Sequence, residues 1–242
     1  MVTLAPILLA ASLAVDPLFV GGAETTSKAA LTTELRDDGF DDRLRLAWSP
    51  APGTRLSASL PFRGRSDRVN RRTGLGDLSV EGRAVLHERA TIRVALDAAF
   101  TLPTGDAKGH LAPGSGSTDF TGGGVVAHAG PRLLLQGGAR GRLATQSGRD
   151  AFAIEAAAGA WLARSERTSA LALVEVLAER VGPERRGGTD VLFSRAERTL
   201  FVAPALALRV DRIRLKGGVA IPVRTDAAVP PWRVGLALEV AR

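Results

Sequence analysis

The chain has 242 residues, a formal net charge of +7 at pH 7 and no cysteine, which excludes disulfide bonds and thiolate sites. Its basic residues are mostly arginines that stand singly at alternate positions of apolar segments. A nucleic-acid-binding protein would gather them in one patch, so no nucleic-acid partner is expected.

The N-terminus resembles a secretory signal peptide. No charged side chain precedes an apolar segment, Ile7–Ala14, and small residues allow cleavage after Ala14 or after Ala23. Residues 1–23 are therefore predicted to be a signal peptide and residues 24–242 a single domain, with a buried N-terminal helix as the alternative. No later stretch reaches the roughly 18 uncharged apolar residues that a membrane-spanning helix requires.

Apolar and polar residues alternate with a period of two through most of the sequence, which is typical of strands with one apolar and one polar face. Ile92, Val94 and Leu96, for example, alternate with Arg93 and Ala95. Most such segments are longer than an average globular strand of about five or six residues, and they are long enough to cross a membrane when tilted. The predicted strands are 28–36, 42–49, 54–63, 75–86, 90–101, 117–128, 131–142, 151–162, 168–180, 198–209, 212–223 and 232–240.

The connections between these strands alternate in length. Short turns such as Pro50–Gly53, His87–Arg89 and Ala129–Gly130 alternate with long polar segments such as Gly64–Gly74 and Leu102–Gly116. Short turns at one rim and long loops at the other are typical of bacterial outer-membrane barrels. The predicted fold is therefore all-β, a single twelve-stranded antiparallel up-and-down transmembrane β-barrel. Its even number of strands places both termini at the short-turn rim.

Strand length, loop asymmetry and the signal peptide indicate that the apolar face of the strands contacts lipid and the polar face lines the lumen. Leu96 and Val219 are expected to face lipid, and the adjacent Ala95 and Ala220 to face water. Aromatic side chains favour headgroup depth, and those expected on the lipid face near the long-loop rim are Phe62, Phe100, Phe120, Phe152 and Trp232, with Trp48 near the other rim.

The polar face supplies the residues predicted to line the pore. They are Asp77, Glu81, Arg83, Arg93, Asp97, Asp119, Arg132, Gln136, Arg140, Arg142, Glu155, Glu175, Arg209, Arg214, Arg233 and Glu239. Arg43, Arg45 and Arg55 share this face, so arginines outnumber carboxylates. An excess of arginine favours the passage of anions over cations.

Three glycine-containing motifs follow one another in the middle of the chain. They are Gly74-Leu75-Gly76-Asp77, Leu102-Pro103-Thr104-Gly105-Asp106 and Gly114-Ser115-Gly116-Ser117-Thr118-Asp119-Phe120. In this order and spacing they resemble the outer-membrane β-barrel family of meta-pathway phenol-degradation operons. The resemblance implies an outer-membrane protein of a Gram-negative bacterium that passes or binds a small, aromatic or hydrophobic solute. It also implies outer-membrane lipid and the insertion machinery as partners, and no catalytic residue.

Two other functions stay open: a plugged barrel with a structural or surface role, and a soluble periplasmic lipocalin-like binding protein. An enzyme is not expected. His87, His110 and His128 lack the spacing of a metal site, and no Gly-x-Ser-x-Gly or phosphate-loop pattern occurs. No cofactor and no metal ion is therefore predicted.

A charge cluster is expected at the long-loop mouth of the barrel. Asp77 and Asp119 share the inner face near the ends of neighbouring strands, and two such carboxylates repel each other unless cations balance them. Arg140 and Arg142 reach the same level on the next strand. These four residues are predicted to anchor the loop Pro103–Gly116, the alternative being two separately solvated carboxylates.

Overall fold

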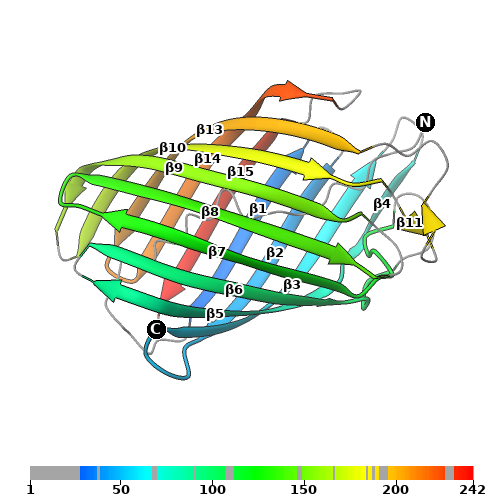
Figure 1. The fold of residues 1–242 in the computed structure, drawn as a ribbon, viewed down its shortest axis with the longest axis horizontal. Coiled ribbons are helices and arrows are strands. Elements are labelled where there is room, and N and C mark those ends of the chain that lie inside the picture. The colour runs from blue at the N-terminus through cyan, green and yellow to red at the C-terminus, as the bar shows by residue number, and fades with distance from the viewer. Residues whose placement is uncertain are drawn as a thin grey trace.

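The computed structural model describes residues 28–36, 39–66, 70–89, 91–106, 112–145, 149–165, 167–183, 185–186, 189–190, 196–226 and 232–241. The predicted signal peptide, with its cleavage sites after Ala14 and Ala23, lies outside the described residues. No helix within these ranges is long and apolar enough to cross a membrane. The regular structure of the described residues consists of β-strands (Figure 1).

Twelve long strands and three short ones occur among the described residues. The long strands are β1 (Lys28–Arg36), β2 (Gly39–Trp48), β3 (Thr54–Ser66), β5 (Leu78–Arg89), β6 (Ile92–Leu102), β7 (Asp119–Ala129), β8 (Leu133–Ala144), β9 (Ala151–Arg164), β10 (Thr168–Val181), β13 (Glu197–Val210), β14 (Ile213–Thr225) and β15 (Arg233–Ala241). The short strands are β4 (Arg71–Leu75), β11 (Arg185–Arg186) and β12 (Thr189–Asp190).

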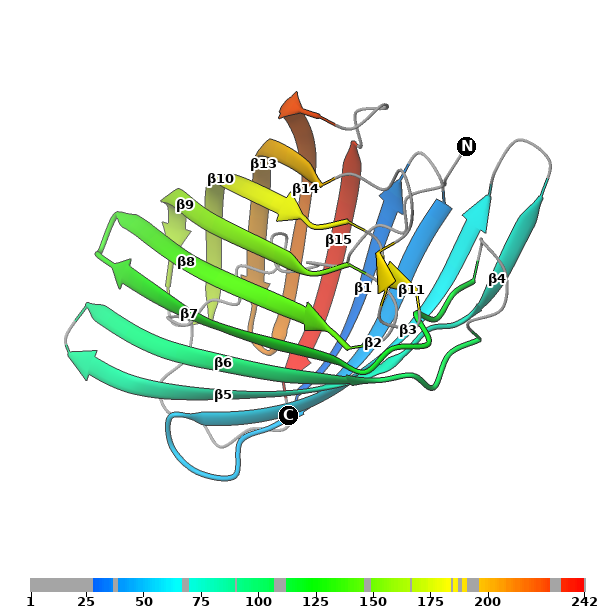
Figure 2. The ribbon, with the colours of Figure 1, turned by 45° about the vertical axis from the view of Figure 1, so that its right-hand side comes forward.

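The long strands form one closed antiparallel ring. Each pairs with the long strands that precede and follow it along the chain. The first and last strands, β1 and β15, then close the ring through a ladder that runs from the pair Lys28–Ala241 to the pair Arg36–Arg233. Figures 1 and 2 show the sheet curling round so that β1 and β15 lie side by side. The predicted twelve-stranded up-and-down barrel fold is confirmed.

One predicted loop is wrong. The described residues of the segment Gly64–Gly74 are mostly paired strand instead: β3 continues to Ser66, and β4 returns beside it as the second strand of a β-hairpin (Figure 2). The chain then leaves the ladder at Gly76 and Asp77 and resumes pairing with β3 as β5, so the predicted strand 75–86 is divided in two. The hairpin escaped prediction because its paired residues are rich in arginine and carry no continuous apolar face.

Large apolar side chains cover the outside of the barrel. Leu96 is 49% exposed and Val219 39% exposed, whereas Ala95 between the outward positions of β6 is 0% exposed. Phe62, Phe120, Phe152 and Trp232 are also outward and exposed at the long-loop ends of their strands, as is Trp48 at the other end. A barrel surrounded by water would bury such side chains, so this pattern fits an apolar belt in contact with lipid.

Some inner-face residues that the sequence predicted to contact water are buried in the structure. Ala95 does point inward, but it is packed with Val125, Ala127 and Val85. Ala220 is 4% exposed and belongs to a second inner cluster. The expectation that these two alanines face water is therefore wrong, because neighbouring inner side chains cover them.

Candidate channel interior

The inner face holds nearly all of the residues predicted from the sequence to line a pore. Fourteen of them lie on the inner face of long strands: Glu81, Arg83, Arg93, Asp97, Asp119, Gln136, Arg140, Arg142, Glu155, Glu175, Arg209, Arg214, Arg233 and Glu239. Asp77 is buried in the break between β4 and β5, and Arg132 is exposed in the turn before β8.

A row of charges crosses four neighbouring strands near the middle of the barrel. Arg83 of β5 donates from Nε to Asp97 of β6, and the Nη2 atom of Arg140 on β8 lies 3.1 Å from the other Asp97 oxygen. Gly123 of β7 stands between Asp97 and Arg140 in the strand register. Because Gly123 has no side chain, Arg140 can extend across β7 to reach the carboxylate.

Gly123 also lies against the backbone of β8. A Cβ atom at this position would come within 2.6 Å of the carbonyl oxygen of Ala139. We expect Gly123→Ala to lower the free energy of unfolding by about 1–3 kcal/mol through overpacking. Gly122→Ala is the matched control, because its Cβ would face outward with no heavy atom within 4 Å. Equal unfolding curves in urea for the two variants would contradict the close approach of β7 and β8.

Three further ion pairs lie on the wall formed by β2, β3 and β5. Arg45 reaches Glu81 at 2.8 Å and also donates to the hydroxyl of Ser57. Arg63 reaches Asp41 at 2.8 Å, with Arg43 at 3.9 Å from the same carboxylate. On this side of the barrel, Asp41 lies between Arg43 and Arg63, and Asp97 lies between Arg83 and Arg140. Each of these two carboxylates therefore has two arginine neighbours.

The wall formed by β9, β10 and β13 is different in character. Its inner face is largely apolar and includes Leu171, Leu173, Leu177 and Phe201, all at most 3% exposed. Trp161 of β9 packs against the part of this surface nearest the short turns. Neighbouring side chains cover these leucines and Phe201, whereas the ring of Trp161 is half-buried and can contact an apolar part of a solute.

Two charged side chains reach carboxylates of β10 from strands beyond β13, one from β14 and one from β15. Lys216 of β14 lies 2.7 Å from Glu175. Arg233 of β15 lies 3.2 Å from Glu179, and its guanidinium carbon is 4.5 Å from the ring centre of Phe201. The sequence places Lys216 on the polar face of its strand, but the predicted pore lining includes neither Lys216 nor Glu179, although alternation puts them on the same faces as Arg214 and Glu175.

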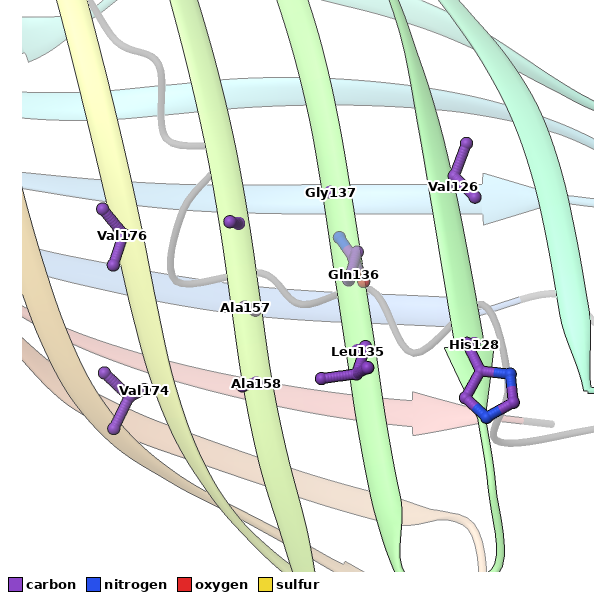
Figure 3. Close-up of a pocket in the computed structure, with 10 residues that line it drawn as sticks. Val126, His128, Leu135, Gln136, Gly137, Ala157, Ala158, Val174 and Val176 are labelled. Atoms are coloured by element: carbon purple, nitrogen blue, oxygen red, sulfur yellow. The ribbon is translucent and has the colours of Figure 1, made fainter.

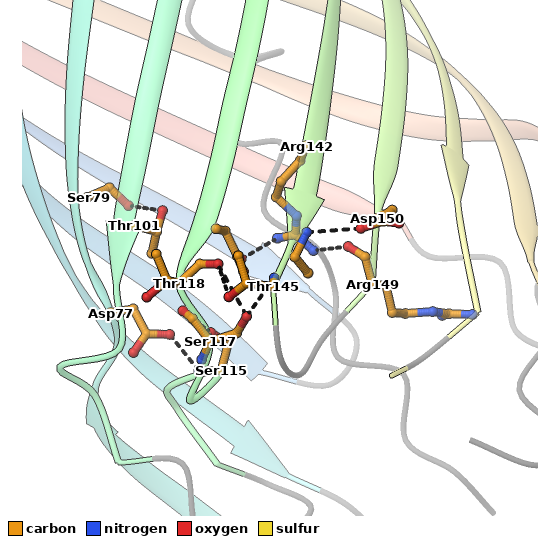
Figure 4. Close-up of polar contacts among 12 residues, drawn as sticks. Asp77, Ser79, Thr101, Ser115, Ser117, Thr118, Arg142, Thr145, Arg149 and Asp150 are labelled. Carbon is orange, nitrogen blue, oxygen red and sulfur yellow. Dashed lines mark hydrogen bonds and ion pairs between the residues drawn. The ribbon is translucent and has the colours of Figure 1, made fainter. Parts of the chain in front are cut away.

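Asp77 anchors the long loop at the mouth. Its carboxylate accepts hydrogen bonds from the backbone amides of Gly105 at 3.0 Å and Ser115 at 2.5 Å. A Cβ atom at Gly105 would lie 2.7 Å from the carbonyl carbon of Gly76, and one at Gly114 would lie 2.7 Å from that of Gly105. The three motifs behind the family resemblance therefore meet at the Asp77 carboxylate. Figure 4 shows Asp77 beside Ser115 of the third motif.

The predicted mouth cluster is correct in one pair and wrong in the others. Arg142 lies 3.7 Å from Asp119 and also donates to the carbonyl oxygen of Arg149 at 2.6 Å (Figure 4). Arg140 pairs with Asp97 and not with Asp119. Asp77 holds the loop through backbone amides, a type of partner that charge balance alone does not predict. Part of the loop, residues 107–111, lies outside the described residues.

The described ranges contain no group of three or more His, Asp or Glu side chains that could hold a metal ion. Within the same ranges, the ion pairs and hydrogen bonds described above join protein groups to one another.

No family model and no curated relative matches the sequence. The fold is similar to that of the COG4313 outer membrane channel from Pseudomonas putida F1, with a TM-score of 0.76 and 12% identity over 90% of this chain and 96% of the channel. The NanC porin matches with a TM-score of 0.58 and 8% identity, and the KdgM porin in complex with disordered oligogalacturonate with 0.54 and 12%. Both porins cover 88% of this chain and are covered over 98% of their own. These proteins are described as a channel and two porins, not as enzymes, and the chain has the fold of these outer-membrane barrel channels.

Proposed function

We propose that the chain is a channel in the outer membrane of a Gram-negative bacterium and passes small solutes. The observation that carries the proposal is the closed ring with exposed apolar side chains outside and charged side chains inside. This arrangement favours lipid as the partner of the outer surface and argues against a soluble lipocalin-like binder. An N-terminal signal peptide, residues 1–23, and recognition by the outer-membrane insertion machinery belong to the same proposal.

The solute is proposed to be small and aromatic or hydrophobic. Among charged solutes of this kind, anions are proposed to pass in preference to cations. The ring of Trp161, half-buried on the inner face beside the apolar cluster of β9, β10 and β13, supports the first property, since it leaves contact area for a ring or alkyl group. The opposite wall supports the second. There Asp97 and Asp41 each have two arginine neighbours, which leaves that side with a positive balance.

Single-channel recording in planar bilayers tests the charge preference. We expect chloride to pass more readily than potassium, because carboxylates that each lie between two arginines leave a positive local potential. Arg140→Gln should reduce this preference while Asp97 keeps Arg83 as its partner. Arg132→Gln, at the exposed turn, should not change it. A reversal potential that indicates cation selectivity would contradict the proposed lining.

Solute uptake into proteoliposomes tests the solute class. We expect an aromatic monocarboxylate such as benzoate to enter faster than a polar monocarboxylate of similar size. Trp161→Ser, which removes the half-buried apolar ring from the inner face, should narrow that difference. The absence of any conductance and uptake in folded protein would instead favour the plugged barrel with a structural or surface role.

A further inference from the structure

Three arginines at the long-loop rim lie on the outer face of the barrel. Arg180 of β10, Arg198 of β13 and Arg224 of β14 are exposed, whereas Glu179, the neighbour of Arg180 on the inner face, is 6% exposed. Their outward position follows from the strand alternation. They therefore differ from the arginines of the interior, and no role in a solute path accounts for them.

The strand register brings these three side chains together. Arg180 stands directly opposite Arg198 in the β10–β13 ladder. Arg224 stands opposite Leu200, two residues from Arg198 on the same outer face, because a register shift in the β13–β14 ladder follows Leu200. Directly opposed residues have Cβ atoms about 5 Å apart and diagonal ones about 7–8 Å. The three guanidinium groups can thus converge on one ligand.

No protein group neutralises this cluster within the described part of the chain. None of the three arginines has an ion pair or side-chain hydrogen bond there, and the carboxylate of the neighbouring Asp226 forms no ion pair with them. Like charges placed directly opposite each other on a sheet are destabilising. An anion bound between them would remove that repulsion, and arginine forks match phosphate oxygens in a bidentate geometry.

An apolar groove lies on the same outer wall, nearer the short turns than the three arginines, and runs across the strands (Figure 3). It has a volume of about 540 Å³ and crosses β7 to β10. Ala156 and Ala158 of β9 form its floor, with Leu135 on one side and Val174 and Val176 on the other. Val176 is four residues below Arg180 on the outer face of β10, roughly 13 Å away at the rise of a strand. The groove is therefore within reach of an acyl chain whose headgroup lies at the arginines.

We propose that this wall binds a phosphorylated glycolipid of the lipopolysaccharide class. One phosphate lies on Arg180, Arg198 and Arg224, and an acyl chain lies in the groove. The proposal rests on the proposed function in one respect, namely that the long-loop rim faces the outer leaflet. Phe152, which is 48% exposed and pairs with Arg180, and Trp232, which is 45% exposed, mark headgroup depth at the same rim. The charged cluster and the apolar groove thus match the two parts of one lipid.

Lipid retention by the full-length protein in detergent tests the headgroup site. Purified protein is incubated with lipopolysaccharide, washed and analysed by native mass spectrometry, with heat-modifiable migration as the check of folding. We expect the triple variant R180Q/R198Q/R224Q to retain at least about tenfold less lipopolysaccharide, since three charge-assisted contacts are lost. The matched control R89Q/R167Q/R212Q removes three exposed arginines at the short-turn rim and should retain as much as the parent.

Three further comparisons identify the ligand. Ala158→Leu should fill the groove and weaken retention of lipopolysaccharide more than that of its deacylated form. Inorganic phosphate, added alone at equal concentration, should bind at least tenfold more weakly than lipopolysaccharide. Phosphatidylglycerol should be retained less than lipopolysaccharide.

Several outcomes would overturn the proposal. One is that both triple variants retain as much lipopolysaccharide as the parent protein. Another is that both lose retention of lipopolysaccharide equally. The third is that inorganic phosphate binds as strongly as lipopolysaccharide. Conductance is measured on the same variants in phosphatidylcholine bilayers. A parent protein that retains lipopolysaccharide but does not conduct would count against the proposed function alone. A conducting protein with unchanged retention in R180Q/R198Q/R224Q would count against the lipid site alone.

Discussion

Replacing Leu96 with arginine is expected to lower the free energy of unfolding by about 2–4 kcal/mol. Leu96 lies near the middle of β6 and is 49% exposed on the outer face. In the folded barrel a charge at this position would sit near the bilayer midplane, where no water or counter-ion stabilises it. Unfolding in urea from phosphatidylcholine vesicles measures the loss, and Val219→Arg on β14 should behave alike.

Ala99→Arg is the matched control on the same strand. Ala99 lies on the inner face, partly exposed, and stands opposite Glu81 in the β5–β6 ladder. An arginine there gains a carboxylate neighbour and should cost less than about 1 kcal/mol. Ala95 would be a poor control, because it is fully buried and would report overpacking. Equal losses for Leu96→Arg and Ala99→Arg would mean that the outer face does not contact lipid.

Replacing Asp77 with asparagine is expected to release the long loop at the mouth. The Asp77 carboxylate is 3% exposed and accepts the amides of Gly105 and Ser115. Asparagine keeps only one acceptor oxygen and turns an NH2 group toward a donor, so one buried amide loses its partner. Charge-assisted hydrogen bonds of this kind contribute about 1.5–3 kcal/mol each. Hydrogen exchange at both amides should therefore accelerate about tenfold or more.

Asp106→Asn in the same loop is the control for the loss of a charge. Asp106 pairs with Arg72, but both side chains are more than a third exposed, at 47% and 37%. An exposed ion pair contributes about 0–1 kcal/mol, so exchange at Gly105 and Ser115 should change little. Equal acceleration in both variants would show that loop charge, and not the Asp77 carboxylate, holds this segment.

The positions of the long strands were predictable because their signal is local. A barrel strand alternates along its own sequence, so the period of two locates it without knowledge of its partners. The largest offset is three residues, as between the predicted strand 75–86 and the observed Leu78–Arg89. The β3–β4 hairpin was missed for the complementary reason. Its residues extend the barrel through pairing alone and have no apolar face that alternation could reveal.

The ion-pair partners of the inner charged side chains were less predictable from the sequence. They depend on the strand register and on whether the intervening strand carries a side chain at that level. Arg140 reaches Asp97 only because Gly123 leaves the space between them open. Asp77 binds backbone amides 28 and 38 residues away in the sequence, and amide donors carry no sequence signature. The alternation along each strand predicted which face a side chain is on. Its contact partners could be identified only from the three-dimensional structure.

The ladder between β1 and β15 constrains how the ring can form. Every other pair of neighbouring long strands is consecutive along the chain, whereas this ladder joins Lys28 to Ala241. The entropy cost of pairing rises with sequence separation, so local hairpins form first and this contact last. Until it forms, β1 and β15 are unpaired edges with free backbone donors and acceptors. The nearly complete sheet is therefore the species most prone to pair with another chain and aggregate.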